Sequence, residues 1–387
     1  MLAPQMSRPS RRHVIALLSV PAVVRSVPVH AQGETRAFDF FRAQAETPRQ
    51  AELRLAAVLP LSGPFALLGD ETWRGLELAA QAAEAPLRFL RLDSPDPAQA
   101  VAEIRRMQGA EKPVAIFGSV SSALALAASQ AADAAGIMFF ELNATANAIT
   151  DRGLRHVWRL GVPARDIGLA GLEALQGPLA RQSRGLKIAM LSDGGGSAES
   201  IADALQASLE SAGMGLDFRF AAPAAEMGGA VQRLRASGAE VLFHTGQEGD
   251  IAALFRVFRE ASWRPRIVVG LGGAHAVEDA ARAAGEGHDG CWVVDVPPTP
   301  AAHPFVDSYR RRYGAAPRSG HSFAAFSLAQ PILTALRAAD PRSAVAALDE
   351  RPGALPNGWG IGFDSRQQNT RAKPVLARWE DGRLSPP

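Results

Sequence analysis

The feature that most constrains this chain is an alternation of short apolar runs with amphipathic segments, which occurs twice along the sequence. In the first half, runs of strand length lie at 53–59, 87–92, 114–117 and 137–140. Between them, apolar residues recur three or four positions apart, which is the spacing of one helix face. Apolar strands that alternate with such helices predict a parallel sheet covered on both faces.

The second set of apolar runs predicts a second lobe of the same kind. Its members are the runs at 186–191, 216–220, 241–244, 267–271 and 292–296. A chain of 387 residues is long enough for two cores of ordinary size. We therefore expect an α/β clamshell of two lobes, each a parallel sheet flanked by helices, joined by a multi-strand hinge. The expected hinge crossings are 159–165, 296–298 and 352–357, with 52–160 and 298–350 in lobe 1, and 161–297 and 351–387 in lobe 2.

The N-terminus has the features of an export signal. The basic pair Arg11-Arg12 precedes an apolar stretch at 14–24, and Val29-His30-Ala31 gives a small-x-small cleavage pattern. This stretch is too short to span a bilayer, which needs about 20 residues. We predict a signal peptide at 1–31, followed by a linker or tether at 32–51. An ordinary secretory signal and a twin-arginine signal both remain open, and either leads to the periplasm.

Charge and cysteine content narrow the class of protein. Four of the 41 basic residues lie in 1–31, which contains no acidic residue, so 37 basic residues face 39 acidic ones in the remainder. This balance is unlike the basic surface of a nucleic-acid binder. The single cysteine, Cys291, cannot form an internal disulfide and lies in an apolar run, which predicts a buried, inert thiol. We expect a soluble monomer that does not bind nucleic acid.

The sequence lacks the residue patterns of common enzyme sites. Its eight histidines show no H-E-x-x-H or other metal-ligand spacing, and neither G-x-S-x-G nor a phosphate-binding loop occurs. The glycines at 194–196 do not continue as G-x-G-x-x-G, because Glu199 takes the place of the last glycine. We therefore expect neither catalysis nor a bound metal or cofactor.

Hydroxyl residues follow two strands of the first half. In an open parallel sheet, ligands bind beyond the carboxyl ends of the strands. Ser122 and Thr145 lie in such turns, where the next helix is expected to begin and free N–H groups favour a carboxylate. Serine and threonine are also ordinary helix caps. The residue types alone leave both interpretations open.

These turns resemble those of a known family, the leucine/isoleucine/valine-binding proteins, which are type I periplasmic receptors of ABC importers. The resemblance covers roughly residues 52–384. Its motifs are Leu61-Ser62-Gly63-Pro64 with Leu68-Gly69-Asp70 and Gly75, Asp93 with Asp96-Pro97 and Ala100, Gly118 with Ser121-Ser122, Asn143-Ala144-Thr145-Ala146, and Phe363-Asp364. At the last of these, Gln367 stands where the family usually has glycine.

The resemblance implies a cleft that closes on a small molecule by hinge bending. It also implies that Ser122 and Thr145, with backbone groups of Val120 and Asn143, hold a ligand carboxylate, and that Leu68 lines the cleft.

The second half departs from the family's amino-acid-binding pattern. Aromatic residues expected there fall near Ser197 and Gly246, and the acidic residue that pairs with a ligand ammonium falls at about Gly272. Either Asp193 or Glu248 replaces that acid, or the ligand is not an α-amino acid, which we favour. The candidate ligand-binding residues are Leu68, Val120, Ser122, Asn143, Thr145, Asp193, Ser197, Gln247 and Gly272.

The sequence therefore predicts a periplasmic solute-binding receptor that closes on an amino acid, a small carboxylate or an amide. Its partner would be an ABC permease in the inner membrane. A periplasmic ligand sensor and a ligand-free interaction scaffold on the same fold are the alternatives.

Overall fold

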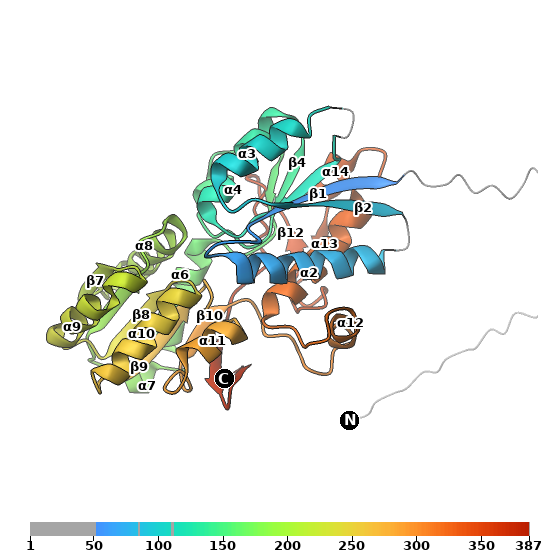
Figure 1. Cartoon of the computed structure of the whole chain (residues 1–387). Helices are drawn as coiled ribbons and strands as arrows, with labels where there is room; N and C mark the ends of the chain where they lie inside the picture. Colours follow the sequence, from blue (N-terminus) through green and yellow to red (C-terminus); the bar gives the residue numbers. More distant parts are fainter. Residues whose placement is uncertain (1–51, 84–85, 110–111, 387) are drawn as a thin grey trace, which may run out of the picture. The chain divides into compact units, whose positions relative to one another are not determined.

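The computed structural model describes residues 52–83, 86–109 and 112–386 (Figure 1). The predicted signal peptide and the predicted linker lie outside these residues. Within the described ranges, no helix has the length and apolar character needed to cross a membrane.

The first sheet is five-stranded and parallel, with the order β2-β1-β3-β4-β5. Its strands are β1 (Leu53–Leu59), β2 (Leu87–Asp93), β3 (Ala115–Gly118), β4 (Met138–Glu141) and β5 (Val157–Arg159). Alternate residues of β1 face opposite sides: Leu55 packs in one apolar cluster, and Ala56 and Val58 pack in another. Burial on both faces is the reason that β3 and most of β1 are apolar, whereas the edge strand β2 carries the exposed Arg88 and Arg91.

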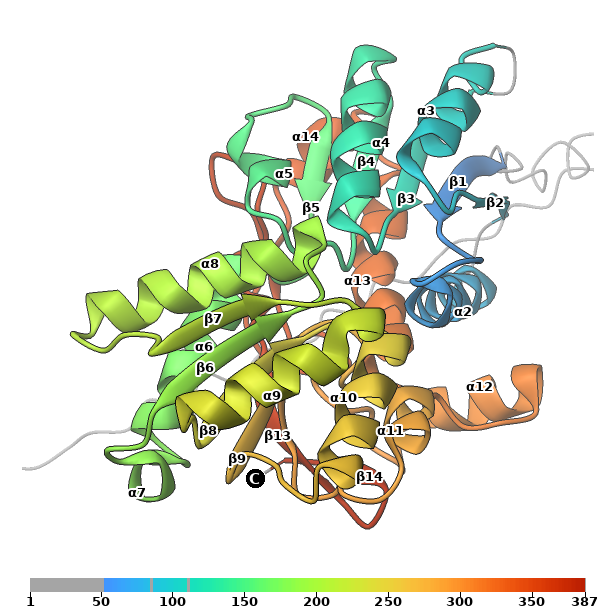
Figure 2. The same ribbon diagram turned by 60° about the vertical axis from the view of Figure 1, so that its left-hand side comes forward.

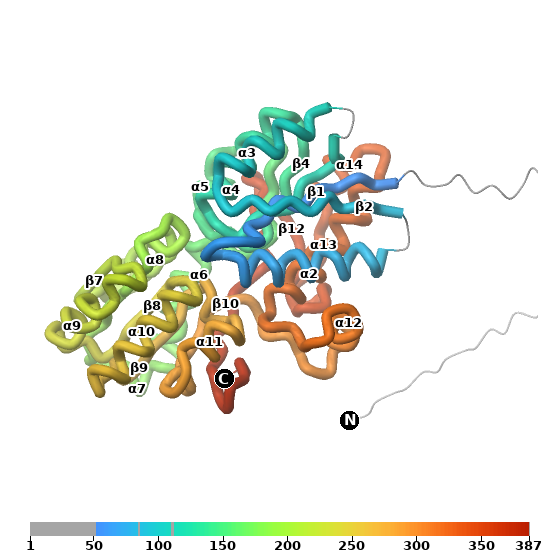
Figure 3. The backbone as a smooth tube through the Cα atoms, viewed as in Figure 1, coloured from blue at the N-terminus to red at the C-terminus, as the bar shows by residue number. Residues whose placement is uncertain are grey.

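Two helix layers cover the first sheet, and one of them is completed by a distant part of the chain. The helices are α2 (Ala66–Ala82), α3 (Pro97–Arg106), α4 (Ser122–Ala134), the short α5 (Ala148–Asp151), α12 (Pro304–Tyr313), α13 (Gly320–Ala335) and α14 (Pro341–Ala346). Helices α3 and α4 pack together, whereas α13 returns to lie beside α2 (Figures 1 and 3). This close approach requires Gly75, since a Cβ atom there would lie 2.1 Å from the carbonyl oxygen of Ser322.

The second sheet has the order β14-β13-β10-β9-β8-β6-β7, with β6 to β10 parallel and a β13–β14 hairpin added antiparallel to β10. Its strands are β6 (Ile188–Ser192), β7 (Phe218–Ala221), β8 (Val241–Thr245), β9 (Ile267–Leu271), β10 (Trp292–Asp295), β13 (Val375–Glu380) and β14 (Arg383–Ser385). Its helices are α6 (Ala164–Gln176), α7 (Ala180–Ser183), α8 (Gly196–Ser211), η1 (Ala224–Glu226), α9 (Met227–Ser237), α10 (Glu248–Glu260) and α11 (Glu278–Ala284). Helix α6 packs against α8, and α10 packs between α9 and α11 (Figure 2). The predicted two-lobed α/β fold is confirmed.

Three segments connect the two sheets. They follow β5, β10 and β12, the last of which pairs with β11 in a small antiparallel sheet; β11 spans Asp349–Glu350 and β12 spans Ile361–Gly362. The first crossing is shorter than the expected 159–165, because α6 begins at Ala164. The third crossing comes later than 352–357: Gln368 still bridges to Arg159 of β5, and the chain joins the second sheet only at Val375.

Buried amides tie the first and third crossings together. The side-chain amide of Gln368 donates to the carbonyl oxygen of Gly161 at 3.1 Å, and that of Asn369 donates to the carbonyl oxygen of Leu160 at 3.0 Å. Both amide residues are buried, so these bonds hold the hinge strands in a fixed register.

Candidate functional site

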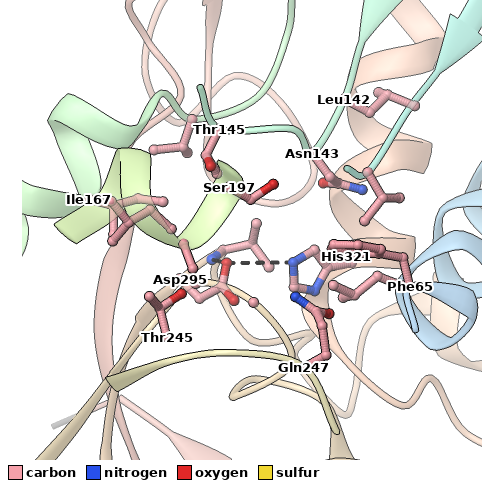
Figure 4. A pocket seen from close by; sticks show the side chains of 18 residues that line it. Phe65, Leu142, Asn143, Thr145, Ile167, Ser197, Thr245, Gln247, Asp295 and His321 are labelled. Atoms are coloured by element: carbon pink, nitrogen blue, oxygen red, sulfur yellow. Dashed lines mark hydrogen bonds and ion pairs between the residues drawn. The ribbon is translucent and has the colours of Figure 1, made fainter. Parts of the chain in front are cut away.

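A cavity lies where the carboxyl ends of the two sheets face each other (Figure 4). It is partly open to solvent and takes its lining from both sheets. Seven of the nine residues predicted from the sequence line it, whereas Ser122 and Asp193 do not. The lining residues are Phe65, Leu68, Val120, Leu142, Asn143, Thr145, Val162, Ile167, Ser197, Ala198, Ile201, Thr245, Gln247, Gly272, Gly273, Asp295, Val296 and His321.

Glu141, the last residue of β4, organises the first-lobe loops of the site. Its carboxylate is fully buried and accepts hydrogen bonds from the backbone N–H groups of Ser119 at 2.7 Å, Asn143 at 3.0 Å and Ala144 at 2.8 Å. The Ser119 hydroxyl donates to it as well. Burial raises the pKa of Glu141, and the N–H donors act in the opposite direction. One carboxylate thus fixes the loops after β3 and β4 relative to each other.

Arg159, the last residue of β5, holds the same region from the other side. Its buried guanidinium donates to the carbonyl oxygens of Thr145 at 2.9 Å and Ala146 at 2.8 Å, and to the side chain of Gln368 at 2.6 Å. Burial lowers the pKa of Arg159 to about 10, while the Glu141 carboxylate acts in the opposite direction. The carbonyl oxygens of this loop are therefore already satisfied.

Thr145 carries the free hydroxyl of the first-lobe wall. Its Oγ1 is buried and has no hydrogen-bond partner within the described part of the chain. Ser122 differs, because its Oγ accepts the backbone N–H of Ala146 at 3.1 Å and it is not among the residues that line the cavity. Thr145 does not begin a helix, as the sequence suggested, since α5 starts at Ala148. A ligand oxygen in the cavity would meet Thr145 rather than Ser122.

The second lobe reaches this wall through Ser197 in the first turn of α8. Its Oγ accepts the backbone N–H of Ser122, the first residue of α4, at 2.9 Å. Because this hydroxyl accepts that bond, its own proton is available for a ligand. In Figure 4 the side chains of Ser197 and Thr145 lie near each other at one end of the cavity.

After β9, the second-lobe side of the cavity is lined by two glycines, Gly272 and Gly273. Gly272 and Gly273 both have left-handed backbone, with φ of 57° and 64°, and a Cβ atom on Gly273 would lie 2.4 Å from the carbonyl oxygen of Gly246. An acidic residue at position 272 would be strained. The sheet edge after β9 therefore presents backbone rather than an acidic side chain to the cavity.

Two other second-lobe candidates serve mainly to shape turns. Gln247 caps α10, and its backbone N–H donates to Asp250 at 3.0 Å in a capping box. Asp193 accepts the N–H of Gly195 at 2.7 Å within its own turn and lies outside the cavity lining.

The sequence interpretation missed three polar residues of the cavity lining, Thr245, Asp295 and His321. Asp295 ends β10, and its Oδ1 accepts the N–H of Val296 at 2.7 Å and lies 3.5 Å from Nε2 of His321 on α13 (Figure 4). Its Oδ2 is buried and has no hydrogen-bond partner among the described residues. The position of Asp295 at a strand's carboxyl end was a usable signal, whereas nothing local marks His321.

The rest of the lining is largely apolar. Phe65, Leu68, Val120, Leu142 and Ile167 supply side chains from both lobes, and the lining that the structure describes contains no lysine or arginine. Such a cavity suits a small molecule with a compact apolar body and few polar groups.

Comparison with known proteins identifies the family to which this chain belongs. The model of the family described as periplasmic binding protein matches residues 52–383. The chain belongs to the periplasmic binding protein family. Members of this family are solute-binding proteins rather than enzymes, and the family implies a periplasmic location.

Individual relatives agree with this family membership. A Leu/Ile/Val-binding protein homolog 7 from Brucella melitensis is 35% identical over 366 residues, covering 87% of this chain and 91% of the relative. The crystal structure of LivJ from Streptococcus pneumoniae in complex with isoleucine matches with a TM-score of 0.74 at 17% identity, covering 86% of this chain and 97% of that one. A solute-binding protein from R. palustris in complex with benzoate gives 0.71 at 20% identity, covering 86% and 94%.

Proposed function

We propose that this periplasmic binding protein captures a small carboxylate with an apolar body and delivers it to an ABC permease in the inner membrane. The observation that carries the proposal is the buried Thr145 hydroxyl, which has no partner among the described residues and belongs to the cavity lining. A carboxylate oxygen there would accept hydrogen bonds from the Thr145 and Ser197 hydroxyls near the start of α4, where the helix dipole favours negative charge.

Binding would be coupled to lobe closure, because the cavity takes its lining from both sheets. Thr145 belongs to the first lobe, while Ser197 and Ile201 belong to the second. A ligand that contacts both lobes stabilises the closed form by its differential affinity for that form. A permease can then recognise the closed receptor.

The ligands of two structural neighbours fit this chemistry. The Streptococcus pneumoniae protein was crystallised with isoleucine, and the R. palustris protein was crystallised with benzoate. Both compounds combine one carboxylate with a compact apolar body. The apolar lining here has the character to accept such a body.

A thermal-shift screen tests the proposal. The purified protein would be heated with leucine, phenylalanine, isocaproate and benzoate, each compared with the matched primary alcohol that lacks the carboxylate. A ligand at 100 times its dissociation constant adds about 2.7 kcal/mol of stability. We expect at least one carboxylate to raise the melting temperature and its alcohol to have little effect. Equal shifts with the alcohols would contradict a carboxylate site, and no shift with any compound would favour an interaction scaffold.

A further inference from the structure

An ion pair outside the cavity joins the two lobes. Asp279 lies in the first turn of α11 in the second lobe, and Arg318 directly precedes Ser319, the residue that caps α13 of the first lobe. Oδ2 of Asp279 lies 3.9 Å from Nε of Arg318. Beside this pair, the backbone N–H of Glu278 donates to the carbonyl oxygen of Arg318 at 2.8 Å. Neither Asp279 nor Arg318 lines the cavity, so neither side chain would contact a ligand there.

The first lobe holds Arg318 in place by itself. The guanidinium forms ion pairs with Asp70 and Glu71 of α2, and its Nε donates to Glu71 at 3.2 Å. The Glu71 side chain is fully buried and also accepts a hydrogen bond from the Tyr309 hydroxyl of α12. Because α2 and α12 belong to the same lobe as Arg318, these contacts do not depend on closure. A guanidinium that is already oriented loses little side-chain freedom when a further carboxylate approaches.

Asp279 is the half of the pair whose surroundings depend on closure. Its Oδ2 is buried and has no hydrogen-bond partner in the described part of the chain. Its Oδ1 lies 3.6 Å from Arg282 of its own helix, whose side chain is 67% exposed. A carboxylate that is partly removed from water is stabilised more strongly by a nearby positive charge than it would be in bulk solvent. Arg318 supplies that charge only while the lobes are together, so the pair favours the closed form.

We propose that Asp279 and Arg318 form an electrostatic latch, which holds the two lobes together and sets the affinity of the receptor from outside the cavity. Asp279 is a positioning residue, since it acts on the ligand only through closure. The effect on affinity rests on the proposed function, whereas the effect on the lobes requires no ligand. A change in the population of the closed form changes the apparent affinity for every ligand by the same factor. The latch therefore adjusts affinity and leaves selectivity unchanged.

A distance measurement without ligand tests the latch. Spin labels on Ala102→Cys in α3 and Ala236→Cys in α9 report the separation of the lobes, since both positions are exposed and the native Cys291 is buried. In this labelled protein, Asp279→Asn should lower the ratio of closed to open molecules about fivefold, the lower end of typical coupling between sites. Equal distance distributions with and without Asp279→Asn would overturn the latch.

Two variants of α11 are the matched controls. Glu278→Gln removes the neighbouring charge of the same first turn, and therefore shares any effect of Asp279→Asn on the helix dipole. Its own ion pair with Arg282 is exposed. Arg282→Gln removes the other cation beside Asp279. Both controls should keep the ratio of the labelled wild type. A fall in either control as large as that in Asp279→Asn would assign the effect to α11 itself and overturn the latch.

Titration links the latch to ligand binding. For those of leucine, phenylalanine, isocaproate and benzoate that bind the wild type, Asp279→Asn should weaken binding by up to the same factor, mainly through faster dissociation. Calorimetry and stopped-flow kinetics measure the two quantities. A factor that differs from one compound to the next would indicate contact with the ligand and overturn the latch. Failure of the wild type to bind any of the four would contradict the proposed function, and the distance measurement would still decide whether the latch exists.

Discussion

The backbone N–H of Ser122 and the hydroxyl oxygen of Ser197 lie 2.9 Å apart and form a hydrogen bond between the two lobes. Ser122 begins α4 of the first lobe, and Ser197 lies in the first turn of α8 of the second. The bond joins the lobes beside the Thr145 hydroxyl, at the wall where we place the ligand carboxylate. Under the proposed function, closure of the lobes would therefore also complete the carboxylate site.

The first prediction concerns this interlobe bond. Ser197→Ala removes both the acceptor for the Ser122 N–H and a donor to the ligand, so affinity for a carboxylate ligand should fall about tenfold. Calorimetric titration measures the change. Ser200→Ala is the control, because its hydroxyl donates to the carbonyl oxygen of Gly196 in the same helix. Equal affinities in both variants would show that Ser197 makes no contact with the ligand.

The second prediction concerns the hydroxyls of Thr145 and Ser122, to which we assign different roles in ligand binding and in stability. Thr145→Val should weaken ligand binding and leave the free energy of unfolding nearly unchanged, because its hydroxyl has no partner to lose among the described residues. Ser122→Ala should instead lower the free energy of unfolding by about 1–3 kcal/mol, since it leaves the buried N–H of Ala146 unsatisfied. Urea unfolding and titration of both variants give the comparison. The reverse pattern would place the ligand on Ser122.

The third prediction concerns Glu141, which holds the loops of the first-lobe wall. Glu141→Gln presents an amide group to N–H donors and removes a buried charge near Arg159, so the free energy of unfolding should fall by about 3 kcal/mol. Glu103→Gln is the control, because its ion pair with Arg106 is exposed and should contribute less than about 1 kcal/mol. Denaturant unfolding measures both. Equal stability of the two variants would contradict the role given to Glu141.

The lobes and most cavity positions were predictable because they follow from local patterns. Strands buried on both faces are apolar throughout, and β1 and β9 have the bounds expected from their sequences. The rule that parallel strands end at one edge brought Asn143, Thr145 and Ser197 to the cavity, whereas Leu68 was expected there from the family resemblance.

The remaining features depend on tertiary contacts that no local pattern encodes. Ser122 and Thr145 are both hydroxyl residues in turns after a strand, so the sequence does not distinguish them. The folded loop does, because the backbone N–H of Ala146 donates to the Ser122 hydroxyl oxygen. His321 reaches the cavity because α13 returns to the first lobe beside α2. The late crossing at Val375 depends on the pairing of Gln368 with Arg159, which are far apart in the sequence.

The fourth prediction concerns acid stability. His244, His275 and His288 are buried in the second lobe, and Nδ1 of His244 lies 2.7 Å from Nε2 of His275. Burial lowers the pKa of His244 to about 3 and that of His288 to about 4, and burial with the neighbouring histidines lowers the pKa of His275. Below about pH 6.5 the unfolded chain therefore binds protons that the folded protein excludes.

The stability that these histidines contribute is present above about pH 6.5 and is lost as the pH falls towards 4, by up to about 1.4 kcal/mol per pH unit for each histidine. Urea unfolding between about pH 7 and pH 4.5 measures how the free energy of unfolding changes with pH. His288→Gln should lower this slope by the contribution of one histidine, which is up to about 1.4 kcal/mol per pH unit. A free energy of unfolding that does not change over this range would contradict the prediction.

The central claim is that a small carboxylate binds between the two sheets. Calorimetric titration of the wild type and of Ala198→Phe, with the compound that gives the largest thermal shift, tests it most directly. Ala198 lines the cavity next to Ser197, so a phenyl ring there would occupy the space of the ligand. We predict one binding site in the wild type and loss of that binding in a variant that remains folded. Undiminished binding in folded Ala198→Phe would contradict the claim, because the ligand would then bind elsewhere.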